Sequence, residues 1–113
     1  MDKLNWYRSL LKRFFQERAD FMKSHPIPGL ETFCLFDEAR DQYLVYNVGW
    51  PGGRRARYVT LFARLHNGKI WIEEDGTEEG LATLLAAAGV PKDEIVLAFH
   101  PPELRDMTEY AVA

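Results

Sequence analysis

Hydrophobic and polar residues recur with a helical period at the start of this chain. Five apolar residues are spaced by three, four or seven positions, which places them on one face of a helix: Leu4, Tyr7, Leu11, Phe14 and Phe21. Asp2 has the side chain of a helix N-cap, and Pro26 and Pro28 cannot continue a helix. We therefore expect an amphipathic helix that ends before residue 25.

The pattern then changes to the period of strands. Residues 31–36, 42–50, 56–66 and 69–73 are rich in aromatic and β-branched side chains, so we expect four antiparallel strands. Only Asn67-Gly68 separates the last two, and this pair favours a type I′ turn because both positions adopt positive φ. The turn sets the register, which pairs Leu65 with Ile70 and Ala63 with Ile72 on one side, and Arg64 with Trp71 and Phe62 with Glu73 on the other.

A second helix is predicted after the fourth strand. Thr77 would cap it, Glu78 and Glu79 would lie in its first turn, and Gly89 would end it. Residues 95–99 form a continuous apolar run that is typical of a strand inside a sheet. The tail from residue 103 has too few apolar residues to predict an element of its own.

These elements predict an α+β fold in one domain of residues 1–113: an N-terminal helix, a four-stranded antiparallel meander, a second helix and a fifth strand. Two helices cover only one face of a five-stranded sheet, so the other face is open to water or to a partner. The pattern places four residues on that open face: Tyr58, Phe62, Arg64 and Trp71.

Composition narrows the functional class. Of the 113 residues, 47% are hydrophobic and 27% are charged, as in ordinary globular proteins, and the aromatic residues are more numerous than a small core easily hides. The net charge of -3 gives no global attraction to nucleic acid or anionic lipid. A single cysteine, Cys34, and the lack of a long apolar run or signal-peptide core lead us to expect a cytoplasmic protein without a membrane segment.

Residue types used in catalysis are present but scattered. The three histidines fall in a linker, at a hairpin and after a strand, so we expect no catalytic residue, metal or cofactor. The acidic run Glu73-Glu74-Asp75 could hold magnesium, but a turn followed by a helix N-terminus accounts for it without a metal. We also predict a polar cluster with a structural role beside the second helix, made of Asp75, His100, Glu103 and Arg105.

A glycine-rich loop between the second and third strands has the composition of an interface. It lacks the lysine, the hydroxyl and the following helix of a phosphate-binding loop, whereas tryptophan and arginine are enriched at interface hot spots. A flexible, solvated hairpin loop is the alternative. With the open sheet face, the loop gives the candidate interface: Trp50, Arg54, Arg55, Tyr58, Phe62, Arg64 and Trp71.

Several segments in the two halves of the chain form an ordered pattern. In the first half they are Asp2-Lys3-Leu4-Asn5-Trp6-Tyr7-Arg8 and Asn47-Val48-Gly49-Trp50 with Gly52, Arg54 and Arg55. In the second half they are Gly68-Lys69-Ile70-Trp71-Ile72, Asp75-Gly76-Thr77-Glu78, Ala88-Gly89-Val90-Pro91-Lys92, Phe99-His100-Pro101-Pro102 and Thr108-Glu109-Tyr110-Ala111-Val112-Ala113. This set spans nearly the whole chain and resembles the XisI family, the excision controlling factors of the fdxN element.

The resemblance implies an accessory protein of a cyanobacterial DNA rearrangement, which acts with a site-specific recombinase and with a nuclease-like companion, XisH. Our leading hypothesis is a non-catalytic module that binds a XisH-like partner and self-associates through the open face. The second hypothesis is a DNA-binding factor that uses Arg54, Arg55 and Arg57, with Arg8 and Lys12 of the first helix. The third and least favoured is a metal-dependent nuclease built around Glu73, Asp75 and Glu103.

Overall fold

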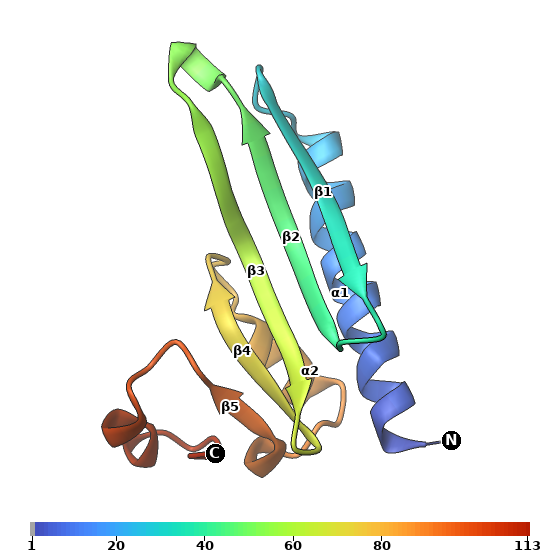
Figure 1. Cartoon of the computed structure of the whole chain (residues 1–113), viewed down its shortest axis with the longest axis vertical. Coiled ribbons are helices and arrows are strands. Elements are labelled where there is room, and N and C mark those ends of the chain that lie inside the picture. The colour runs from blue at the N-terminus through green and yellow to red at the C-terminus, as the bar shows by residue number, and fades with distance from the viewer. Residues whose placement is uncertain (1) are drawn as a thin grey trace.

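Five strands form one sheet in the computed structural model, which describes residues 2–113 (Figure 1). The order across the sheet is β1 (Leu30–Asp37), β2 (Gln42–Gly49), β3 (Ala56–His66), β4 (Lys69–Asp75) and β5 (Ile95–Leu97). The first four strands are antiparallel neighbours. Helices α1 (Lys3–Ser24) and α2 (Leu81–Ala87) lie on the same face of the sheet. The predicted α+β fold is therefore confirmed.

The fifth strand lies at an edge of the sheet, so its predicted interior position is wrong. The chain leaves β4, passes through α2 and a 3-10 helix (Lys92–Glu94), and returns beside β4 in a parallel direction, as a helical crossover requires. The tail then contributes an isolated bridge between Val96 and Ala111. It also forms a 3-10 helix (Pro102–Met107), which the polar composition of the tail did not predict.

Helix α1 begins and ends where the sequence predicts. The Asp2 carboxylate accepts a hydrogen bond from the Leu4 N–H at 2.9 Å, and the chain leaves the helix at His25. Its buried residues are Tyr7, Leu10, Leu11, Phe15 and Ala19. Phe21 is 49% exposed, contrary to the predicted stripe. Positions seven residues apart fall about 20° behind each other on a helix, so Phe14 and then Phe21 rotate away from the sheet.

The hairpin between β3 and β4 follows the predicted turn. Asn67 and Gly68 have φ values of 52° and 76°, and Leu65, Arg64 and Ala63 have the expected partners. The predicted pair of Phe62 and Glu73 is wrong, because Phe62 lies opposite Glu74. A β-bulge leaves Glu73 as an extra residue on β4 and shifts every later pair by one.

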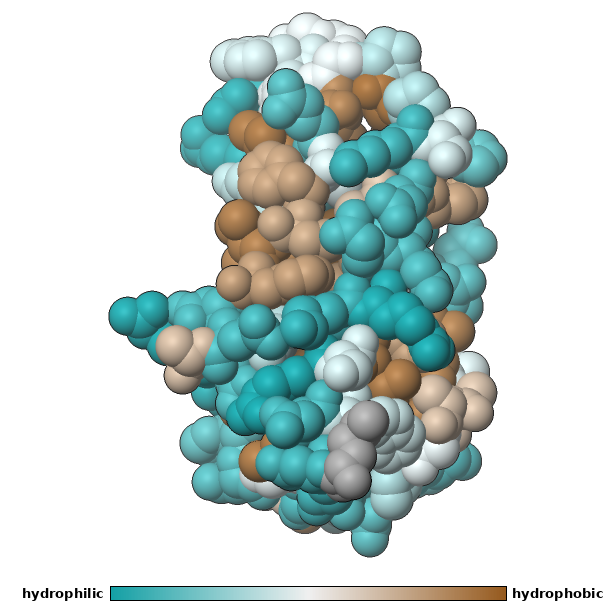
Figure 2. Space-filling view, turned by 90° about the vertical axis from the view of Figure 1, so that its right-hand side faces the viewer, coloured by the Kyte–Doolittle hydropathy of each residue, from teal (hydrophilic) through white to brown (hydrophobic). Residues whose placement is uncertain are grey.

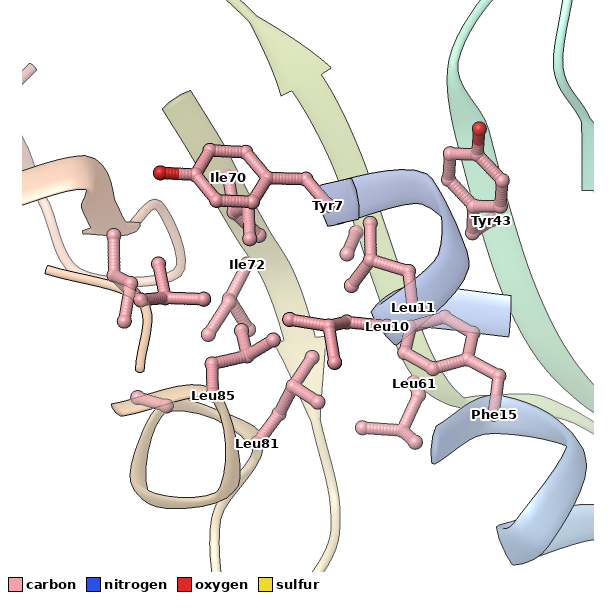
Figure 3. Close-up of a cluster of buried hydrophobic side chains, with 14 of the residues drawn as sticks. Tyr7, Leu10, Leu11, Phe15, Tyr43, Leu61, Ile70, Ile72, Leu81 and Leu85 are labelled. Carbon is pink, nitrogen blue, oxygen red and sulfur yellow. The ribbon is translucent and has the colours of Figure 1, made fainter. Parts of the chain in front are cut away.

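The core lies between the sheet and the two helices (Figure 3). Ile70 and Ile72 of β4 are fully buried with Leu11 of α1 and Leu85 of α2. Leu65 lies on the same side of the sheet, as its pairing with Ile70 predicts, but it is only partly buried, at the rim of this cluster. Its position next to the exposed turn explains the partial burial. Cys34 of β1 is also partly buried, and burial raises the pKa of its thiol.

The start of α2 differs from the predicted Thr77 cap. Asp75, at the end of β4, accepts hydrogen bonds from the Thr77 N–H at 2.9 Å, the Thr77 hydroxyl at 2.6 Å and the Leu81 N–H at 2.6 Å. The helix therefore begins at Leu81, and Glu78 and Glu79 lie in the connection before it. The carboxylate of Asp75, placed upstream of the helix, does the capping that the sequence assigned to Thr77.

Candidate functional site

The sheet face away from the helices carries an apolar patch. Tyr43 and Val45 of β2 are buried under α1, so the alternating residues Leu44 and Tyr46 point to the other side. The strand register extends this side into two apolar rows across β1, β2 and β3. We call these residues the open face: Phe33, Tyr46 and Val59 in one row, and Leu35, Leu44 and Phe62 in the next.

Parts of the open face are strongly exposed. Leu35 is 48% exposed and Phe33 is 36% exposed, although both belong to a paired strand. A hollow lined in part by Leu35 and Leu44 lies at one end of the patch. Figure 2 shows hydrophobic surface gathered on the side of the molecule away from α1, with hydrophilic surface above and below it. Exposed, contiguous apolar surface of this kind is typical of an interaction site.

Charged residues close both ends of the open face. The register places Glu31, Val48 and Arg57 in the row beyond one end, and Asp37, Gln42 and Arg64 in the row beyond the other. Asp37 pairs with Arg40 at 2.7 Å, and this hydrogen bond holds the pKa of Asp37 below its usual range. Arg64 pairs with Glu73 at 2.8 Å. Within residues 2–113, no side-chain hydrogen bond or ion pair engages Glu31 or Arg57.

Tyr58 does not share this face, so its predicted position is wrong. Val45 pairs with Leu61 whereas Tyr46 pairs with Val59, which leaves Thr60 as an extra residue on β3. The bulge reverses the alternation, and Tyr58 lies opposite the buried Asn47 on the helix side. Asn47 fixes the bulge: its amide donates to the Thr60 hydroxyl at 2.7 Å and to the Tyr58 carbonyl at 3.3 Å. Tyr58 is 47% exposed there.

Trp71 lies on the predicted face, but its ring is partly covered. The guanidinium of Arg64 lies 5.6 Å from the ring centroid, as the hairpin register predicts, and that of Arg105 lies 5.5 Å from it. The indole N–H donates to the His66 carbonyl at 3.0 Å. Arg105 belongs to the C-terminal 3-10 helix. Trp71 thus holds the tail against the sheet.

The loop between β2 and β3 forms the projecting tip of the longest hairpin (Figure 1). Trp50 is 60% exposed, and the guanidinium of Arg55 lies 5.5 Å from its ring centroid. The backbone N–H of Trp50 donates to the Gly29 carbonyl at 2.9 Å. Gly49 allows this approach, because a Cβ there would lie 2.0 Å from that carbonyl oxygen. The base of the tip is therefore held firmly, while Trp50, Arg54 and Arg55 face solvent.

The predicted polar cluster is not assembled as one group. Asp75 holds the start of α2, as described above. Arg105 donates to the carbonyls of His100 at 3.0 Å and Ala98 at 3.3 Å, and Glu103 is exposed. Across residues 2–113, acidic, histidine and cysteine side chains do not gather in a group of three or more that could hold a metal ion. In the same part of the chain, each helix is too short or too polar to cross a bilayer.

This geometry defines the class of protein. It is an α+β domain with helices on one face of the sheet and an uncovered second face. The chain belongs to the XisI family, because the family model described as XisI protein matches residues 1–112. It is similar to a solved XisI-like protein from Anabaena variabilis ATCC 29413, with 31% identity, a TM-score of 0.87 and coverage of 97% of this chain and 99% of the other.

A second solved structure is also similar, the fdxN element excision controlling factor XisI from the same Anabaena variabilis strain. The two chains are 38% identical, with a TM-score of 0.87 and coverage of 99% of this chain and 100% of the other. No curated protein matches the chain.

The structure separates the predicted interface residues into three places. Phe62, Arg64 and Trp71 lie on the sheet face away from the helices, with the Trp71 ring partly covered by the tail. Trp50, Arg54 and Arg55 lie at the tip, and Tyr58 lies on the helix side. Sequence reasoning missed Phe33, Leu35, Leu44 and Tyr46. Leu44 and Tyr46 alternate along β2 with its buried residues, so they point away from the helices. Phe33 and Leu35 lie beside them, but finding this requires the register between β1 and β2.

Proposed function

We propose that this chain is a non-catalytic accessory protein of a DNA-element excision system, and that it acts by binding a XisH-like protein. Membership of the XisI family and the 38% identity with an fdxN element excision controlling factor support the excision role. A site-specific recombinase is a further partner in this proposal. Control of excision by such a protein requires recognition of other macromolecules and no chemistry of its own.

The exposed tip carries the proposal for partner binding. Trp50 presents an aromatic ring with an arginine against it, on a hairpin whose base is fixed by the bond from Trp50 to Gly29. Tryptophan and arginine contribute the largest share of binding energy at many interfaces. Backbone hydrogen bonds from Gly53 to Trp50 at 3.3 Å and from Arg54 to Pro51 at 3.2 Å hold the turn, which reduces the backbone entropy that docking would cost.

The test measures the affinity of this chain for a XisH-like protein encoded in the same genome. Trp50→Ala should weaken binding by about tenfold or more, which is the effect of losing one hot-spot residue. Met107→Ala is the matched control, because Met107 is 81% exposed and lies in the C-terminal 3-10 helix. Equal affinity of the Trp50→Ala and Met107→Ala variants would refute the role of the tip.

DNA binding is a second candidate function, and the exposure of Arg54, Arg55 and Arg57 at one end of the molecule favours it. Phosphate contacts release counterions, so DNA affinity would fall steeply with salt, whereas affinity for a protein partner would change little. Titration of a short duplex at low and high salt distinguishes the two. Salt-sensitive binding that disappears in the Arg54→Ala/Arg55→Ala variant would favour the DNA function.

A further inference from the structure

The charges that border the open face follow a regular pattern. Both bordering residues of β1 are acidic, Glu31 and Asp37, and both bordering residues of β3 are basic, Arg57 and Arg64. The central strand β2 contributes only Val48 and Gln42 to the same rows. At both borders of the open face, β1 therefore contributes an acidic residue and β3 a basic one. The two strands lie on either side of β2, which contributes no charge to these rows.

We propose that two copies of this chain pack their open faces together around a two-fold axis that runs along β2. The rotation exchanges β1 and β3, so it places Glu31 of one copy over Arg57 of the other, and Asp37 over Arg64. It does so twice, because a two-fold interface repeats every contact. Between these charges, Phe33 meets Val59 and Leu35 meets Phe62, in the aligned packing of two sheets.

The charge pattern selects this axis and this occupant. A two-fold axis across the strands would place Glu31 over Asp37 and Arg57 over Arg64, so like charges would meet at both ends. A second copy rotated about β2 supplies the opposite charge at all four places and an apolar row for each apolar row. Glu31 and Arg57 form no intramolecular side-chain pair among the described residues. Asp37 and Arg64 already pair with Arg40 and Glu73 within the chain, so the Glu31–Arg57 contacts contribute most to this selection.

The size of the open face sets the expected strength. Three strands spaced about 4.8 Å apart and about eight residues long present roughly 350 Å² of flat area. This is below the roughly 800 Å² per partner of a standard interface. We therefore expect a weak, reversible dimer, which the charge pairs orient and the apolar contact stabilises. The surface is distinct from the tip proposed to bind the XisH-like partner.

A charge-exchange experiment tests the proposal. Sedimentation equilibrium should show a monomer–dimer equilibrium for the unmodified chain. Glu31→Arg and Arg57→Glu should each raise the dissociation constant about tenfold or more, because each places like charges together at two sites. The variant that combines Glu31→Arg and Arg57→Glu exchanges the two charges and should restore the dissociation constant to within about threefold of the original.

The controls separate this proposal from the proposed function. Arg54→Glu makes the same arginine-to-glutamate change as Arg57→Glu, but at the tip and outside the open face. It should leave the dissociation constant of the dimer unchanged. Circular dichroism should confirm that all variants are folded, since each substituted side chain is exposed. A chain that is monomeric at a concentration of several hundred micromolar, or a combined variant as weak as the single ones, would overturn the proposal. Loss of XisH-like binding alone would not affect it.

Discussion

Asp75 is predicted to be a stability residue, and its substitution by alanine tests this role directly. The third hypothesis from the sequence would make Asp75 a metal ligand. In the structure its two carboxylate oxygens accept three hydrogen bonds, from Thr77 and Leu81, where the chain passes from β4 into α2. Replacing the carboxylate with a methyl group removes all three bonds and leaves the Leu81 N–H at the helix start without its acceptor.

The size of the effect follows from these contacts. Loss of a side-chain cap at a helix N-terminus costs about 1–2 kcal/mol. The bond to the Thr77 N–H is charge-assisted and adds about 1 kcal/mol. Asp75→Ala should therefore lower the free energy of unfolding by about 2–3 kcal/mol. At about 4 °C per kcal/mol for a chain of this size, the melting temperature should fall by about 8–12 °C.

The assay is thermal unfolding followed by circular dichroism, with two comparison variants. Asp75→Asn keeps one oxygen acceptor and should lose about half as much stability. Glu78→Ala should change stability by less than about 0.5 kcal/mol, because Glu78 is exposed before α2 and forms no hydrogen bond through its side chain in the described residues. An Asp75→Ala variant as stable as Glu78→Ala would show that the carboxylate does not hold the turn. The structural reason for ranking a metal role last would then fail.

Three further predictions concern the core, the hairpin and the response to acid. Ile72→Ala should lower the free energy of unfolding by about 2–5 kcal/mol and Leu65→Ala by clearly less, because Ile72 is fully buried and Leu65 lies at the rim; urea denaturation compares them. Gly68→Val should cost about 1 kcal/mol or more through its positive φ of 76°, and an unchanged melting temperature would contradict the turn assignment. The hydrogen bond from Arg8 at 2.7 Å lowers the pKa of Asp41, so this carboxylate stabilises the fold above its unfolded pKa of about 4, and the contribution is lost as pH falls through the lower folded value. Melting temperatures from about pH 5 to pH 2 should therefore decline less steeply in Asp41→Asn than in the unmodified chain, and parallel curves would refute the assignment.

Local sequence signals predicted the parts of the fold that depend on a few neighbouring residues. Asn67-Gly68 determines its own turn, because the positive φ values are properties of those two positions. The ends of α1 are also local: the Asp2 side chain caps the first turn, and Pro26 and Pro28 cannot continue a helix. The bounds of α1 and the β3–β4 register near the turn therefore agree with the structure.

Contacts between distant residues explain what the sequence did not predict. The bulge at Thr60 is held by Asn47, which also accepts a hydrogen bond from the Thr32 hydroxyl at 2.6 Å on a third strand. Alternation within β3 alone cannot reveal it, so Tyr58 was assigned to the wrong face. Arg105 contacts Trp71 across 34 positions of sequence, so the tail partly covers a ring that the sequence alone placed on an uncovered face.

The mass of the complex formed with a XisH-like protein tests the central claim most directly. Light scattering on a size-exclusion column should show the unmodified chain and the XisH-like protein eluting together at a mass that contains both. With both proteins at a concentration a few times the dissociation constant of the unmodified complex, the Trp50→Ala variant should elute mostly apart from the XisH-like protein. It should keep its melting temperature, because Trp50 is 60% exposed and lies outside the core. Separate elution of the unmodified chain, or a complex that persists unchanged in Trp50→Ala, would contradict the account.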